Sequence, residues 1–237
     1  MKWNDTGFLL SKRKYNENSV IAEFFTLNSG KVTGLIFGAS SKKIKSYLEI
    51  GNLLHVNFSS NSPDRIGNFK IEIYKVNTPF FFENKNKLLC IISVLNLIKS
   101  LTVENQINKN LYNLISDFFE IIKLNDWLQK YILWELDFYK VVGYNLNFKD
   151  LVKTEKTNNK NIYFVLSNNR KKIIPSFLVE KNYKKTDQKN LFDGIKILND
   201  FLEKSILKPN NLKFPKERHD FSKKNIPNSR RYWQENW

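Results

Sequence analysis

The sequence predicts an α+β protein with two parts, a small closed β-barrel followed by an α-helical region. In the first 80 residues, short runs rich in β-branched and aromatic residues alternate with polar turns. After these runs the spacing of apolar residues changes from two to three and four, which is the spacing of amphipathic helices. The length of 237 residues also suits two domains, at about 100–200 residues per domain.

Five strands are expected in residues 1–80. Polar turns separate them, and Gly30 offers the positive φ that one of these turns favours. The expected strands are 6–14, 20–27, 32–39, 53–59 and 67–76. Five short antiparallel strands at this spacing are typical of a barrel of the OB type, and an SH3-like barrel would give nearly the same pattern.

Helices are expected at 88–98, 104–123, 127–143 and 191–207, where apolar residues recur every three or four positions. Asp126 is the expected N-cap of the third helix, and Gly143 its end. Runs at 162–166 and 173–174 predict a β-hairpin at about 160–175. Proline residues then punctuate a polar, basic segment, which predicts an extended tail. The predicted organisation is therefore a barrel at 1–80, a helical domain with an inserted hairpin at 81–207, and a tail at 208–237.

Charge is distributed unevenly along the chain. There are 39 Lys and Arg residues against 23 Asp and Glu residues, a net charge of +16 with a sequence pI near 9.7. Residues 1–80 hold 11 basic and 6 acidic residues, residues 81–150 hold 8 of each, and residues 151–237 hold 20 and 9. The excess lies in the two flanks, which predicts an anionic partner such as nucleic acid or a membrane surface.

Composition and motifs argue against several other classes of protein. A single Cys rules out a disulfide framework and a multi-Cys zinc site, and the longest apolar run, 88–98, is too short to span a bilayer. The start of the chain does not read as a secretory signal, which predicts a cytoplasmic protein. The phosphate-binding, dinucleotide-binding and serine-hydrolase motifs are missing. With Cys90 in an apolar helix and His55 on a strand, we expect a binding protein without a cofactor, not an enzyme.

Basic residues gather near the loops of the expected barrel. Such loops can meet on one side of a small barrel and follow a phosphate backbone, although a single surface Lys proves nothing. Tyr15, Tyr47 and Phe58 are candidates to stack on bases and equally candidates for the core. The predicted nucleic-acid-binding residues are Lys12, Arg13, Lys14, Lys31, Lys42, Lys43, Lys45 and Arg65.

Several short motifs, taken in order, resemble a known family. The first is W-x-D-x-G at residues 3–7, followed by R-x-Y-x-E-x-S at 13–19, F-T-x-x-x-G-K at 25–31 and G-x-x-S-K at 38–42. Residues 48–52 resemble the family's L-Q-P-G segment, with Leu-Glu-Ile-Gly in its place. Y-x-x-W-E-L at 131–136 and G-Y-x-L at 143–146 follow. Together, over about residues 1–205, the chain resembles the RecO family of bacterial recombinational DNA-repair mediators.

The resemblance implies an N-terminal OB-fold and an α-helical C-terminal domain. It implies binding of single- and double-stranded DNA, annealing of complementary strands and a location near the bacterial nucleoid. It also implies partners: RecR, with which such a protein loads RecA onto DNA coated by single-strand-binding protein, and the acidic C-terminal tail of that coating protein. Many members carry a four-Cys zinc motif after G-Y-x-L, whereas residues 151–178 hold no Cys. We therefore expect a degenerate, metal-free version of that hairpin.

Two alternatives to a DNA-binding mediator stay open from the residues alone. An RNA-binding or ribosome-associated OB-fold protein fits a basic barrel equally well, because a fold does not fix a function. A purely structural adaptor would show no salt-dependent binding of nucleic acid. The basic tail either forms the rim of a site for the acidic tail of single-strand-binding protein or makes further DNA contacts. A segment that only increases solubility is an equal alternative. Its residues are Arg218, Lys223, Lys224, Arg230 and Arg231.

Overall fold

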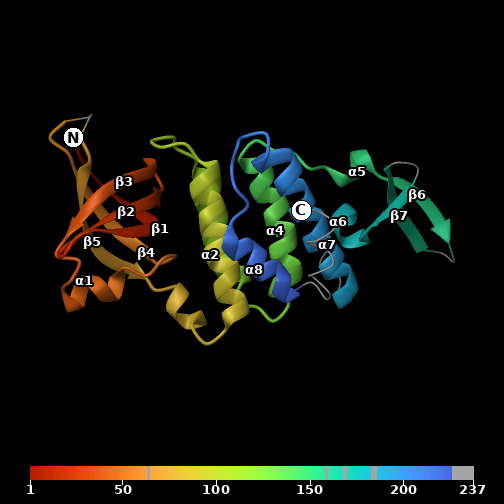
Figure 1. The fold of residues 1–237 in the computed structure, drawn as a ribbon, viewed down its shortest axis with the longest axis horizontal. Helices are drawn as coiled ribbons and strands as arrows, with labels where there is room; N and C mark the ends of the chain where they lie inside the picture. The colour runs from red at the N-terminus through yellow and green to blue at the C-terminus, as the bar shows by residue number, and fades with distance from the viewer. Residues whose placement is uncertain (63–64, 158–159, 168–169, 183–185, 226–237) are drawn as a thin grey trace. The chain divides into compact units, whose positions relative to one another are not determined.

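A computed structural model describes residues 1–62, 65–157, 160–167, 170–182 and 186–225 (Figure 1). The chain divides into two compact units. The first contains residues 1–113 and 215–221, and the second contains residues 114–214 and those from 222 onward. Among the described residues, no helix is long and apolar enough to cross a membrane.

The first unit begins with a closed five-stranded barrel, with strand order β1-β2-β3-β5-β4 (Figure 1). This confirms the predicted OB-type barrel. One expectation is wrong: the strands are not all antiparallel, because β3 and β5 close the barrel in parallel through Gly34–Gly67 and Leu35–Asn68. The strands are β1 (Lys2–Asn16), β2 (Ser19–Thr26), β3 (Gly30–Phe37), β4 (Leu53–Ser59) and β5 (Gly67–Lys75).

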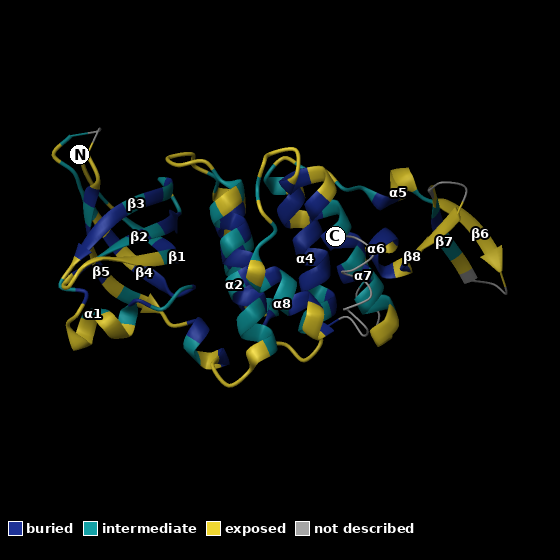
Figure 2. Cartoon of the chain, in the orientation of Figure 1, coloured by how far each residue is buried: buried dark blue, intermediate teal, exposed yellow. Residues whose placement is uncertain are grey.

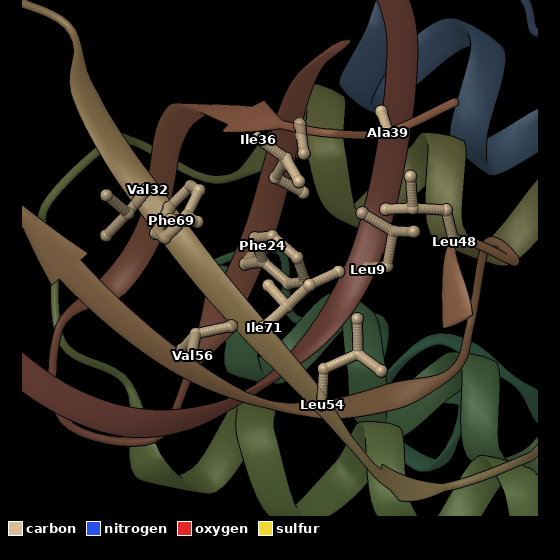
Figure 3. Packing of buried hydrophobic residues seen from close by; sticks show 11 residues of the cluster. Leu9, Phe24, Val32, Ile36, Ala39, Leu48, Leu54, Val56, Phe69 and Ile71 are labelled. Carbon is tan, nitrogen blue, oxygen red and sulfur yellow. The ribbon is translucent and has the colours of Figure 1, made fainter. Parts of the chain in front are cut away.

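The barrel is filled by apolar side chains that alternate along its strands (Figure 3). Phe24 and Phe69 meet edge to face at its centre, with ring centroids 5.0 Å apart. At one end Trp3 stacks on Phe58 at 4.9 Å, so Phe58 belongs to the packing of the barrel. The buried cluster contains Leu9, Ala22, Phe24, Val32, Ile36, Ala39, Leu48, Leu54, Val56, Phe69 and Ile71.

A short helix, α1 (Lys42–Tyr47), lies between β3 and β4, where the sequence predicted a loop. Ser41 is its N-cap, and the Ser41 hydroxyl accepts a hydrogen bond from the amide of Ile44 at 3.3 Å. None of the six residues of the helix is fully buried, and its apolar face consists of Ile44 and Tyr47, which are partly buried against the barrel core. So short an apolar pattern was not recognised as a helix. The prediction of a loop is therefore wrong for this segment.

Helical elements follow the barrel in the first unit. The turn η1 (Thr78–Phe81) leads into α2 (Lys85–Leu101), whose cap is Asn84, and Cys90 is buried within it. The helices α3 (Lys109–Ile121) and α8 (Lys216–Asn225) each cross the boundary between the units. The predicted extended tail is thus wrong for Lys216–Asn225, which is helical, while residues 226–237 lie outside the described residues.

The second unit contains helices and a small sheet. The helix α4 starts at Trp127, and Asp126 occupies the N-cap position as predicted. Its side chain makes no capping hydrogen bond and pairs instead with Lys130 at 3.1 Å. The predicted hairpin is part of a three-stranded antiparallel sheet, in which the added strand β6 is exposed along its whole length (Figure 2). The elements are α4 (Trp127–Val141), α5 (Phe148–Leu151), β6 (Lys153–Thr157), β7 (Lys160–Ser167), β8 (Arg170–Ile174), α6 (Ser176–Glu180), α7 (Gln188–Phe201) and the π-helical turn η2 (Leu202–Leu207).

Two glycines with left-handed backbone differ in what surrounds them. Gly30 has φ +69°, and a Cβ there would lie 2.0 Å from the carbonyl oxygen of Gln106. Gly38 has φ +71°, and a Cβ there would meet nothing within 4 Å. The turn at Gly30 is therefore packed directly against the backbone that follows α2.

We predict that Gly30→Ala destabilises the protein more than Gly38→Ala does. Both substitutions carry the left-handed penalty of about 1–2 kcal/mol, and Gly30→Ala adds an overpacking cost of about 1–3 kcal/mol because the backbone of Gln106 must move. Urea unfolding of the two variants measures the difference. Equal losses of stability would show that the contact with Gln106 does not constrain the turn.

Candidate nucleic-acid interface

A groove of about 500 Å³ lies at one end of the barrel. It brings together two of the predicted basic clusters, because both the end of β1 and the helix α1 line it. Arg13, Lys14 and Lys45 are exposed there. The lining residues are Lys12, Arg13, Lys14, Asn16, Glu17, Ser19, Val20, Ala39, Ser40, Lys45 and Leu48.

The geometry of the groove follows from the strand register and one turn. Asn16 pairs with Ser19, and Ser19 pairs with Phe37, so β1, β2 and β3 reach the same end of the barrel together. The turn residue Asn18 then fixes the start of the β3–α1 connection. Its carbonyl accepts from the amide of Ala39 at 3.0 Å, and its side chain accepts from the hydroxyl of Ser40 at 2.5 Å. These bonds hold α1 beside the basic end of β1.

The cations of the groove are not equivalent. The ammonium of Lys12 donates to the carbonyl of Leu48 and lies 3.6 Å from the carboxylate of Glu49. These contacts partly neutralise Lys12 and join β1 to the end of α1. Lys42 and Lys43 are exposed on α1 beside the groove but do not line it. A phosphate in the groove would meet Arg13, Lys14 and Lys45 first.

Exposed aromatic rings accompany these cations. Tyr15 and Phe37 are large exposed side chains at the same end of the strands, although neither lines the groove. Tyr47, by contrast, packs against the barrel core. Aromatic faces beside a positively charged groove suit single-stranded nucleic acid, whose bases stack while its phosphates meet the cations.

Lys31 has a different role from the one predicted. Its ammonium donates to the carbonyls of Lys99 and Thr102, at 2.8 Å and 2.5 Å, at the C-terminal end of α2. Burial lowers the pKa of Lys31 below its usual value, with Glu23 and Glu104 acting in the opposite direction. Lys31 binds the exposed carbonyls of a helix end, where a cation is favoured. The prediction that it contacts nucleic acid is not supported by this geometry.

The helix α2 is attached to β1 and β2 of the barrel by a polar cluster. The ammonium of Lys99 lies 3.0 Å from the carboxylate of Glu23 on β2 and donates to the hydroxyl of Ser11 on β1 at 3.2 Å. Ser11 in turn donates to Glu23 at 2.8 Å. This polar cluster joins α2 to the barrel.

The remaining predicted residues lie elsewhere. Arg65 is exposed and lines a second pocket that is described below. The prediction that Arg218 is a surface contact is wrong, because Arg218 is fully buried in α8 with its guanidinium over the ring of Phe221. Lys223 and Lys224 are exposed at the end of α8, whereas Arg230 and Arg231 lie outside the described residues.

Other candidate chemical groups do not form a site. His55 is exposed and lies edge to face against Tyr74, with ring centroids 4.8 Å apart, and Cys90 is buried. Among the described residues, no three His, Cys, Asp or Glu side chains come close enough together to hold a metal ion. In the β6–β8 sheet the ammonium of Lys171 makes a cation–π contact with Phe164, 4.7 Å from the centre of its ring.

We predict that Lys31→Met lowers stability and leaves DNA binding nearly unchanged. The substitution keeps the apolar stem but leaves two helix-end carbonyls without their charged donor, a loss of about 1.5–3 kcal/mol. Urea unfolding and a salt titration of single-stranded DNA binding measure the two effects. A reduced salt dependence at unchanged stability would restore Lys31 to the interface.

We also predict that the chain folds without zinc. The 151–178 segment offers Glu155 as its one conventional ligand, and zinc needs four close donors. Elemental analysis of purified, untagged protein should find far less than one zinc per chain. One zinc per chain that survives dialysis against a chelator would contradict the prediction.

Comparisons with known proteins agree with the geometry of the barrel. The model of Recombination protein O N terminal matches residues 1–75, and that of Recombination protein O C terminal matches residues 83–217. A solved asparaginyl-tRNA synthetase of Entamoeba histolytica aligns over 90% of this chain and 59% of its own at 11% identity. Its TM-score of 0.29 is too low to carry an argument.

Three curated relatives are each called DNA repair protein RecO. The protein of Wolbachia sp. subsp. Drosophila simulans is 27% identical over 92% of this chain and 98% of its own. The protein of Rickettsia canadensis is 31% identical over 78% and 74%, and that of Ehrlichia chaffeensis is 30% identical over 70% and 67%. The chain therefore belongs to the RecO family of DNA repair proteins.

Proposed function

We propose that this RecO-family protein binds single- and double-stranded DNA through the basic groove at the end of its barrel. The observation that carries the proposal is that Arg13 and Lys14 on β1 line one groove with Lys45 on α1. Each phosphate that meets such a cation releases a counterion, which favours binding without regard to sequence. Tyr15 and Phe37 add faces on which unpaired bases can stack.

Annealing follows from the same chemistry. Two complementary strands repel each other through their phosphates, and a protein that neutralises phosphates lowers this repulsion. Contacts to the backbone do not read sequence, so they leave the base edges able to pair. We propose that the chain brings complementary strands together in this way, as the family resemblance implies.

The proposed partners follow from the same family. We propose that the chain acts with RecR to load RecA onto DNA coated by single-strand-binding protein, and that it contacts the acidic tail of that coating protein. The exposed Lys223 and Lys224 at the end of α8 are the described candidates for the contact with the tail. We propose binding and no catalysis, because neither Cys90 nor His55 lies in the groove.

Salt-dependent binding tests the proposed interface. We predict that Arg13, Lys14 and Lys45 changed together to Ala reduce the log–log salt slope for single-stranded DNA by roughly 2, because about 0.7 is lost for each phosphate contact. The measurement is a fluorescence titration at several salt concentrations, with RNA of the same length as a competitor. Tighter binding to RNA than to DNA would favour the RNA-binding alternative.

The matched control removes the same charge from another surface. Lys149, Lys189 and Lys204 are exposed in the second unit, and changing them together to Ala leaves the groove intact. This control should leave the slope nearly unchanged. Equal slopes for the groove variant and the control would remove the groove from the interface.

A further inference from the structure

A second pocket, of about 650 Å³, lies within the first unit and has no basic cluster. None of Lys12, Lys14 and Lys45 lines it, so it is separate from the groove. Its described walls come from the start of β1, the β2–β3 turn with the start of β3, the end of β4 with residues 60, 62 and 65–67, and the segment that follows α2. Its volume is within the roughly 300–1,000 Å³ of sites for small molecules.

The pocket has an aromatic wall. Trp3 and Phe58, which face each other across β1 and β4, stack with their planes 19° apart. Behind them Phe69 lies 6.4 Å from Trp3 and 5.3 Å from Phe58, centre to centre. Trp3 and Phe58 both line the pocket and are only partly buried. The barrel thus presents two fixed aromatic side chains at this place.

The opposite wall, residues 104–107, is fixed by hydrogen bonds to β3. The amide of Asn105 donates to the carbonyl of Lys31 at 2.9 Å, and the hydroxyl of Thr33 donates to the carboxylate of Glu104 at 2.6 Å. The backbone of Gln106 lies against Gly30 so closely that a Cβ there has no room. This wall is therefore held in place by contacts within the first unit.

The rim combines apolar side chains with two cationic groups. Ile66 and Ile107 line the pocket although they are 48% and 58% exposed. Arg65 also lines it, and the N-terminal ammonium of Met1 donates to the carbonyl of Ser60 at 2.7 Å. The rim therefore offers apolar surface together with positive charge.

We propose that this pocket holds an unpaired base of single-stranded DNA, with Arg65 meeting the adjoining phosphate. The inference rests on the proposed DNA binding and adds a site that distinguishes single strands from duplex. A base fits aromatic and aliphatic walls with a few polar groups, and every base has a face that can stack. The acidic tail of a protein would need several cations, whereas Arg65 is the one cationic side chain among the lining residues described. Paired bases in a duplex present no free face.

The test compares two probes that carry the same phosphates, oligothymidylate and an abasic oligonucleotide of equal length. The dissociation constant of the abasic oligonucleotide divided by that of oligothymidylate reports contacts to bases and not to phosphates. We predict that Ile66→Ser with Ile107→Ser lowers this ratio by about fivefold or more, because a base in the pocket loses two apolar contacts. The salt slope should stay the same, because no cation is removed. Both side chains are exposed, so the variant should remain folded.

Val103→Ser is the matched control, because Val103 is 68% exposed and does not line the pocket. It should leave the ratio unchanged. Trp3→Leu, with folding checked by circular dichroism, should lower the ratio as the rim variant does. In addition, oligothymidylate carrying a photoreactive base should crosslink to the peptides that contain Trp3 or Phe58.

Failure of this inference can be distinguished from failure of the proposed groove. If the groove variant reduces the salt slope while the rim variant leaves the ratio unchanged, the groove binds DNA and the pocket proposal is wrong. If Tyr15→Ala alone removes the preference for oligothymidylate over the abasic oligonucleotide, bases stack near the groove and the pocket proposal is equally wrong. If the rim variant spares the ratio but weakens binding of an acidic, Phe-ended peptide, the pocket docks a protein.

Discussion

The first strand of the barrel pairs along its first half with β4 and along its second half with β2. The pairs with β4 run from Lys2–Ser59 to Phe8–Leu53, and those with β2 run from Gly7–Thr26 to Asn16–Ser19. This one strand, together with the short parallel contact of β3 and β5, closes the sheet. Its start lines the aromatic pocket and its end lines the basic groove, so the register of β1 determines both sites.

The second constraint is the attachment of α2 to the barrel. Lys31 and Lys99 make this contact through helix-end carbonyls and through Glu23, and the segment after α2 then bonds back to β3. Two lysines of a strongly basic chain are thereby used inside the first unit. The net charge therefore overestimates the number of basic side chains that are available to bind phosphates. Exposed basic side chains come together in the groove.

The sequence predicts those parts of the structure that have a regular apolar period. The barrel strands and the main helices follow such periods, and the family motifs agree with them. The helix α1 and the strand β6 were not predicted, because the first has no buried residue and the second is exposed throughout. Lys31 bonds to a carbonyl distant in the chain, which no local pattern reveals, and Arg218 is buried although its charge predicts a surface position. The second pocket likewise joins four segments whose nearness appears only when the barrel closes.

The proposed interface at the groove is tested most directly by measuring how fast individual lysines are acetylated, with and without single-stranded DNA. Lys14 and Lys45 are exposed in the groove, so they should react readily alone and be protected by DNA. Lys31, bonded to two carbonyls, should react slowly in both conditions. Equal reactivity of Lys14 and Lys45 with and without DNA, together with protection of a fast-reacting Lys31, would contradict the account.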